Sequence, residues 1–170
     1  MNRTAPIRVV SGDITTFTCD AIVNAANEGL RGGGGVDGAI HRKAGPKLRE
    51  ACQKSPEIRP GVRCEVGEAC LTPGFDLNVK GIIHTVGPVW RGGHSGEAEQ
   101  LAACYRSSLQ LAADNGFRSI AFPAISCGVF GFPVARACEI VISTIQSFPR
   151  VEELFDEILL VAFDDEMASP

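Results

Sequence analysis

The sequence predicts an α/β sandwich, in which helices cover both faces of one sheet. Apolar runs of strand length alternate along the chain with segments of helical period. These runs are almost continuously apolar, which is typical of strands that are buried on both faces. Two of them, 69–74 and 81–86, are separated by only a short polar stretch, which favours a hairpin. The hairpin makes the expected sheet mixed rather than wholly parallel.

The elements follow in order. The expected strands are IRVV (7–10), AIVNA (21–25), ACLTPG (69–74), GIIHTV (81–86), SIAFPAI (119–125) and EILLVAF (157–163). The expected helices cover residues 38–45, 46–54, 98–116 and 133–148. Within 98–116, apolar side chains recur at helical spacing from Leu101 to Ala112, and Gly116 stands where a helix cap is expected. Pro133 suits the first turn of the last helix.

Length and composition fit one domain, which we place at residues 1–170. The chain is 45% hydrophobic and 21% charged, as ordinary globular proteins are. It has no apolar run of about 20 residues for a membrane span, and residues 1–10 lack a signal-peptide pattern. Its seven cysteines are scattered and odd in number, which favours reduced thiols and a cytoplasmic location.

The charge balance bears on partners. The formal net charge is −4, and the basic residues between Arg42 and Arg63 alternate with polar and acidic ones. Nucleic-acid binders usually carry a basic stripe that neutralises phosphates. We therefore expect no nucleic-acid partner. We also expect no membrane partner and a monomer.

Two glycine-rich loops are the strongest functional signal. NAANEGLRGGGGVDGAIH (24–41) and PAISCGVFGFP (123–133) each follow an expected strand and lead into an expected helix. Such loops direct free backbone N–H groups toward one point, and the helix dipole adds partial positive charge. Two neighbouring loops of this kind could bind a diphosphate without Lys or Arg. The alternative is that the glycines only form turns.

The usual nucleotide and hydrolase motifs are absent. The chain has no G-x-x-x-x-G-K-[ST] loop, and the spacing after Gly32 does not continue as a dinucleotide-binding fingerprint. The nearest approach to a G-x-S-x-G elbow, residues 93–97, ends in Glu97. The loops thus belong to none of these classes.

Three polar side chains beside the loops allow two interpretations. Asn27 ends a strand and Asp37 follows the glycines, where Asn and Asp are also favoured turn and cap residues. In a binding site, one could hold a sugar hydroxyl and the other could steer a water. Asp13, in GDIT (12–15), could cap a turn at Thr15 or accept a hydrogen bond from an adenine amino group.

Five segments together resemble the macrodomain family, and within it the MacroD-type ADP-ribosyl hydrolases. They are GDIT (12–15), AIVNAAN (21–27), GGGGVDGAIHRKAG (32–45), HTVGPVWRGG (84–93) and PAISCGVFGFP (123–133), and the match runs from about residue 7 to 165. The resemblance implies a three-layer α/β/α sandwich with a mixed, mostly parallel six-stranded sheet. It also implies an ADP-ribose cleft at the carboxyl ends of the strands.

The resemblance assigns roles to individual residues. Asp13 and Ile14 would bind adenine, with Phe163 as a further candidate, and Asn27 would bind the distal ribose. A loop of Gly34, Gly35, Val36 and Asp37 would surround the phosphate and that ribose. The diphosphate would rest on Ser126, Cys127, Gly128, Val129 and Phe130, and Phe130 would also close over the ribose.

The implied reaction is hydrolysis of an acyl ester on the distal ribose. Substrates would be mono-ADP-ribosylated proteins, modified on Glu or Asp, and O-acetyl-ADP-ribose, with Asp37 and Asn27 as the catalytic residues. Asp37 would orient and deprotonate a water, and no metal or cofactor is implied. The alternative is a non-catalytic reader of ADP-ribose. A nucleophilic Cys127 is disfavoured because no His lies near it in sequence.

Overall fold

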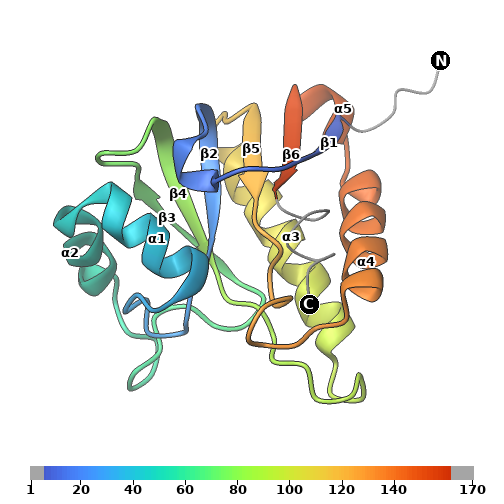
Figure 1. The fold of residues 1–170 in the computed structure, drawn as a ribbon, viewed down its shortest axis with the longest axis horizontal. Helices are drawn as coiled ribbons and strands as arrows, with labels where there is room; N and C mark the ends of the chain where they lie inside the picture. Colours follow the sequence, from blue (N-terminus) through green and yellow to red (C-terminus); the bar gives the residue numbers. More distant parts are fainter. Residues whose placement is uncertain (1–5, 162–170) are drawn as a thin grey trace.

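The computed structural model describes residues 6–161 and contains one sheet between two helical layers (Figure 1). The strand order is β1 (Ile7–Val10), β6 (Glu157–Val161), β5 (Ser119–Phe122), β2 (Cys19–Ala25), β4 (Val79–Thr85) and β3 (Ala69–Pro73). Neighbouring strands pair in parallel except β3, which forms the antiparallel hairpin with β4. The predicted three-layer sandwich with a mixed six-stranded sheet is confirmed.

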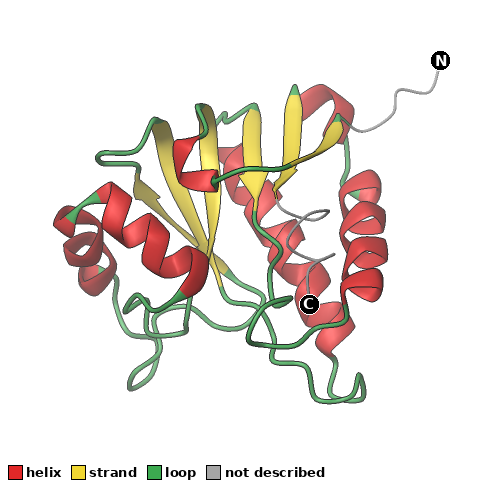
Figure 2. Cartoon of the chain, in the orientation of Figure 1, coloured by secondary structure: helices red, strands yellow, loops and turns green. Residues whose placement is uncertain are grey.

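The helices divide between the two faces of the sheet (Figure 2). One face is covered by α1 (Gly35–Ala44) and α2 (Pro46–Lys54), and the short turn η1 (Ile14–Thr16) packs with them. The other is covered by α3 (Glu97–Asp114), α4 (Val134–Ser147) and α5 (Val151–Leu154).

Alternation along β2 builds a separate core on each face. Ile22 packs with Ile40 of α1 and Leu48 of α2, whereas Val23 packs with Leu101 of α3. Successive side chains of a strand point to opposite faces, so the near-continuous apolar run of β2 fills both cores. This packing fixes the strand ends that carry the candidate loops.

Several boundaries differ from those expected. The helix expected to begin near Gly38 begins at Gly35, because the N–H of Gly38 already donates to the Gly34 carbonyl at 3.1 Å. The strand expected over 119–125 ends at Phe122, since Pro123 has no N–H to continue the ladder. Gly116 follows α3 with a φ of 71°, as a C-terminal cap requires. Residues 162–163 of the last expected strand, including Phe163, lie outside the described residues.

The topology places both glycine-rich loops at one edge of the sheet. One follows β2 and the other follows β5, and these two strands are parallel neighbours. The carboxyl ends of parallel strands share an edge, where α/β proteins bind ligands. Within residues 6–161, no helix is both long and apolar enough to cross a membrane.

Candidate functional site

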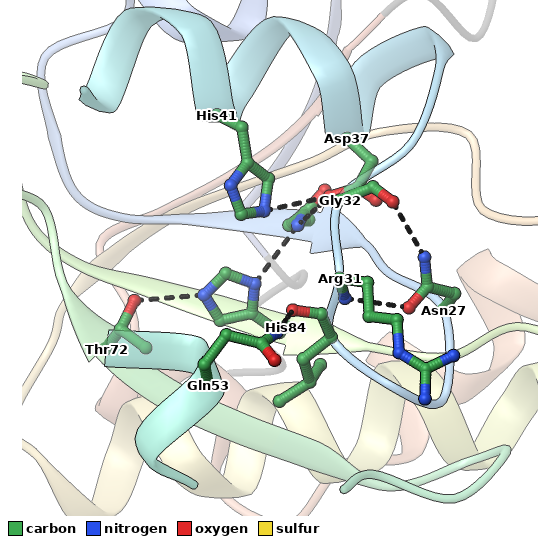
Figure 3. A network of polar contacts seen from close by, with 10 residues as sticks. Asn27, Arg31, Gly32, Asp37, His41, Gln53, Thr72 and His84 are labelled. Atoms are coloured by element: carbon green, nitrogen blue, oxygen red, sulfur yellow. Dashed lines mark hydrogen bonds and ion pairs between the residues drawn. The ribbon is translucent and has the colours of Figure 1, made fainter. Parts of the chain in front are cut away.

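Asn27 shapes the first loop with both groups of its amide. Its Nδ2 donates to the carbonyl of Gly32, and its Oδ1 accepts from the N–H of Arg31, each at 3.0 Å (Figure 3). A Cβ built on Gly33 would lie 4.0 Å from Asn27 Nδ2 and 3.5 Å from Asp37 Oδ2. The loop therefore brings Asn27 and Asp37 to the same point beneath Gly33. The interpretation of Asn27 as a turn residue is confirmed, and its role in ligand binding stays a prediction.

The glycines of this loop meet two different needs. Gly34 and Gly35 are exposed, and a Cβ on either would have no atom within 4 Å. Gly38, in contrast, packs so closely that its Cβ would lie 2.5 Å from the Gly33 carbonyl oxygen. Gly38 is thus required by packing, whereas Gly34 and Gly35 leave bare backbone facing open space.

Asp37 lies in the first turn of α1 and is only 5% exposed. Its Oδ1 accepts a hydrogen bond from Asn24 Nδ2 at 2.8 Å, and His41 Nε2 lies 3.4 Å from the same oxygen. Its Oδ2 is the atom turned toward Gly33. Burial raises the pKa of Asp37 above its usual value, and the Asn24 hydrogen bond, His41 and Arg49 oppose that rise. A carboxylate that is held on one oxygen and has a raised pKa is suited to accept a proton.

Asn24 and His84 connect Asp37 to the edge of the sheet, and the sequence analysis gave neither a role. Asn24 Nδ2 lies 3.0 Å from His84 Nδ1, and His84 Nε2 lies 2.9 Å from Thr72 Oγ1 (Figure 3). Burial lowers the pKa of the fully buried His84 to about 3, so its ring is neutral. The available signal was a polar residue inside each of two apolar strands, AIVNA and GIIHTV. Such residues need buried partners.

The second loop presents its backbone to solvent. Ser126 has a φ of 66°, and its carbonyl accepts from the N–H of Phe132 at 2.9 Å, which closes the turn. A Cβ on Gly128 would have no atom within 4 Å, and Val129 is fully exposed. The Ser126 hydroxyl is buried without a hydrogen-bond partner among the described residues.

Cys127 carries no sign of activation. Burial raises the pKa of its thiol to about 11, which keeps it protonated near neutral pH. A nucleophilic cysteine needs a lowered pKa instead. This agrees with the expectation that Cys127 is not a nucleophile.

A groove of about 420 Å³ joins the two loops. Asn27 of the first loop and Phe130 of the second both line it, beside apolar walls that include Val66, Val86 and Val89. One wall is fixed by the buried Glu97, which accepts N–H groups from Arg91, Gly93 and Ser95 at 2.6–2.9 Å. Burial alone would raise the pKa of Glu97, but these N–H groups lower it to about 2.

Asp13 and Ile14 lie at the same edge of the sheet, after the outermost strand β1. Asp13 Oδ1 accepts from the N–H and the hydroxyl of Thr15, at 3.0 and 2.7 Å, and this pair of bonds lowers the pKa of Asp13. The cap interpretation of Asp13 is therefore confirmed, while its exposed carboxylate still faces solvent. Ile14 is buried in the core formed with α1. The adenine role of Phe163 falls outside the described residues.

The described cysteines and histidines form no recognisable metal centre. Within residues 6–161, no three His, Cys, Asp or Glu side chains are grouped so that they could hold a metal ion. All seven cysteines of the sequence are free thiols, and Cys52, Cys64 and Cys104 are buried.

Comparison with known proteins places this arrangement in a family. The family model of the Macro domain matches residues 23–141. A macro domain-containing protein of Xanthomonas campestris is 55% identical over 94% of this chain and 89% of its own length. The O-acetyl-ADP-ribose deacetylase of Salmonella typhimurium is 51% identical over 97% of this chain and 91% of its own.

Solved structures agree with the sequence comparison. The Oceanobacillus iheyensis macrodomain with ADP is 45% identical, covering 91% of this chain and 81% of its own, with a TM-score of 0.83. The Trypanosoma brucei macrodomain in complex with ADP-ribose is 40% identical, and the match covers 96% of this chain and 66% of its own, with a TM-score of 0.81. This chain belongs to the macrodomain family.

Proposed function

We propose that this chain is a hydrolase that binds ADP-ribose and cleaves acyl esters on its distal ribose. The observation that carries the proposal is Asp37, which is buried with one oxygen held by Asn24 and the other turned toward Gly33. A module that only binds a diphosphate needs the bare backbone but not a constrained, buried carboxylate. The substrates would be O-acetyl-ADP-ribose and proteins carrying mono-ADP-ribose on Glu or Asp.

Relatives support the chemical class of the substrate. The similar protein of Salmonella typhimurium is named an O-acetyl-ADP-ribose deacetylase, and the Trypanosoma brucei structure is a complex with ADP-ribose. The free thiols fit work in the reducing cytoplasm. We further propose that the chain acts as a monomer.

The geometry suggests how the ligand would lie. Adenine would lie near Asp13 and Ile14, and the diphosphate would lie across the open backbone of Gly34, Gly35 and Gly128. The distal ribose would then reach Asn27 and Phe130. Its acyl substituent, or the modified protein side chain, would leave through the groove that these two residues line.

The proposed step requires only water and one base. Asp37 takes a proton from a water as the water oxygen attacks the acyl carbon, and the tetrahedral intermediate then collapses. The bond between the acyl carbon and the ribose oxygen breaks, the ribose oxygen takes the proton that Asp37 holds, and ADP-ribose and a carboxylic acid leave with Asp37 again ionised. General-base catalysis raises a rate by about 10²–10⁴-fold. Together with positioning of the water, this is sufficient for an ester, which is a reactive bond.

The decisive experiment measures turnover on substrates that differ only in linkage: acetyl, glutamate, serine and arginine. We expect cleavage of the acetyl and glutamate esters only. Asp37→Asn should lower kcat by at least about 100-fold while ADP-ribose binding persists, because it removes the base but keeps the shape. The exposed Asp114→Asn on α3 is the matched control and should retain full activity.

Two results would overturn the proposal. Full activity of Asp37→Asn would remove Asp37 from the reaction. Tight ADP-ribose binding by the wild type with no turnover on any ester would make the chain a reader.

A further inference from the structure

Three buried side chains form a hydrogen-bonded chain behind Asp37. Asn24 of β2, His84 of β4 and Thr72 of β3 project from the sheet face that α1 and α2 cover. They link Asp37 to the edge strand through distances of 2.8, 3.0 and 2.9 Å. The hydrolytic step described above uses none of them directly. Burying so many polar groups is costly unless each has a partner.

The direction of each hydrogen bond between Asp37 and Thr72 follows from the contact that Thr72 makes at the end of the series. Thr72 Oγ1 lies 3.2 Å from the carbonyl oxygen of Pro73, which can only accept. The hydroxyl therefore donates to Pro73 and accepts from His84 Nε2–H. His84 Nδ1 is then unprotonated and accepts one N–H of Asn24, and the second N–H of that amide goes to Asp37 Oδ1.

The opposite arrangement creates a conflict at Asn24. A proton on His84 Nδ1 would face the Asn24 NH₂ group, which is also a donor. Rotating the amide would bring Asn24 Oδ1 against the Asp37 carboxylate, where two acceptors would meet. With Asp37 ionised, only the His84 tautomer with a proton on Nε2 gives each of the three contacts one donor and one acceptor.

We propose that Thr72 and His84 are positioning residues, which lock the Asn24 amide so that it donates to Asp37 and keeps this carboxylate oriented and ionised. The proposal rests on the proposed function of Asp37 as the base. It extends the catalytic apparatus to the edge strand β3, two side chains beyond Asn24.

The other groups around Asp37 are accounted for. His41 lies on the same helix as Asp37, and Arg49 and Cys52 belong to α2. The neutral His84 of β4 contacts Asn24. Burial raises the pKa of Cys52 to about 11, so that thiol adds no charge near neutral pH. Among the influences that lower the pKa of Asp37, the Asn24 hydrogen bond is larger than those of His41 and Arg49. Loosening the Asn24 amide should therefore raise the pKa of Asp37 further.

The test compares Thr72→Val, which has nearly the same shape without a hydroxyl, with Thr72→Ser, which keeps the hydroxyl. In Thr72→Val, the His84 Nε2–H loses its acceptor and the Asn24 amide loses its lock. The acid limb of the kcat profile should move to higher pH by roughly half to one unit, and kcat should fall roughly five- to tenfold. The Kd for ADP-ribose should stay within about twofold, since no ligand contact changes. Thr72→Ser should match the wild type.

Two measurements do not depend on turnover. Nitrogen-15 NMR of the imidazoles should show His84 of the wild type protonated on Nε2 and bare on Nδ1 near neutral pH. Carbon-13 NMR titration of the Asp37 carboxyl should give a higher pKa in Thr72→Val than in the wild type or Thr72→Ser. These readouts remain valid if the hydrolase proposal itself fails.

The inference is overturned by either of two results. One is a proton on His84 Nδ1 in the wild type. The other is an Asp37 titration that is the same in Thr72→Val and in the wild type. A melting temperature for Thr72→Val close to that of Thr72→Ser establishes that the comparison is made between folded proteins.

Discussion

At the residue scale, burial gives Asp37 properties that its position in the sequence does not reveal. A carboxylate after four glycines could be an exposed helix cap, and Asp is favoured there. In the structure it is 5% exposed and its partners are side chains of the sheet and of α1. Burying this charge costs free energy and raises the pKa of Asp37. The raised pKa in turn makes Asp37 a better base.

Removing the charge of Asp37 should therefore stabilise the fold. Burial raises its pKa above the ordinary 3.8, so the folded protein binds more protons at this group than the unfolded chain. Stability is then lost as pH rises through the folded pKa. Asp37→Asn should be more stable than the wild type by roughly 0.5–2 kcal/mol at neutral pH. Melting curves recorded at several pH values should show this advantage shrinking on acidification; an advantage that is constant with pH would contradict the mechanism.

The residues that sequence reasoning could and could not find differ in how they act. Asn27, Asp37 and the glycines stand in a recognisable segment, and the structure brings Asn27 and Asp37 together beneath Gly33. Asn24 and His84 act on each other across paired strands, where they occupy matching positions of β2 and β4. Their partnership depends on strand order and register, which a single sequence does not state. The polar positions were visible, but their partners were not.

At the element scale, the two strand–loop–helix connections are similar in design. Each follows one of two parallel neighbours, β2 and β5, and each exposes glycine backbone. Hydrophobic patterning predicted these elements well because both faces of the sheet are buried. It failed by a few residues at their ends, where Pro123 stops β5 and the Gly34 carbonyl starts α1 early.

Alanine substitution of the open glycines should leave the stability of the free protein unchanged and weaken ligand binding. Gly34→Ala and Gly128→Ala add a Cβ that meets no atom within 4 Å, and neither glycine has a positive φ. We expect little change in melting temperature but an ADP-ribose affinity lower by roughly tenfold or more, which is about 1.4 kcal/mol. Calorimetric titration measures the affinity.

Gly38→Ala provides the contrasting control. Its Cβ would meet the Gly33 carbonyl oxygen at 2.5 Å, so both stability and binding should fall. Unchanged binding in Gly34→Ala and Gly128→Ala would mean that the diphosphate does not lie against these loops.

At the scale of the whole molecule, the proposed diphosphate contacts come from the backbone and not from cationic side chains. The chain has a formal net charge of −4, and the proposed diphosphate contacts are backbone N–H groups of two loops. Binding should then depend weakly on salt. Between about 50 and 200 mM NaCl the Kd for ADP-ribose should change by less than roughly threefold, whereas a surface making 6–10 phosphate contacts would lose about 10³–10⁵ in affinity. A steep slope in the same titration would indicate a cationic binding surface.

The position of Thr72 on β3 links the periphery of the fold to its chemistry. Within the described chain, β3 is the outermost strand beside β4, with no further strand on its outer flank. Fraying of a sheet begins at such borders and costs less than global unfolding. Gentle warming or dilute denaturant would then abolish ester hydrolysis first, while the glycine loops still bind the nucleotide. The protein would pass through a partly unfolded state that still binds its ligand but no longer hydrolyses the ester.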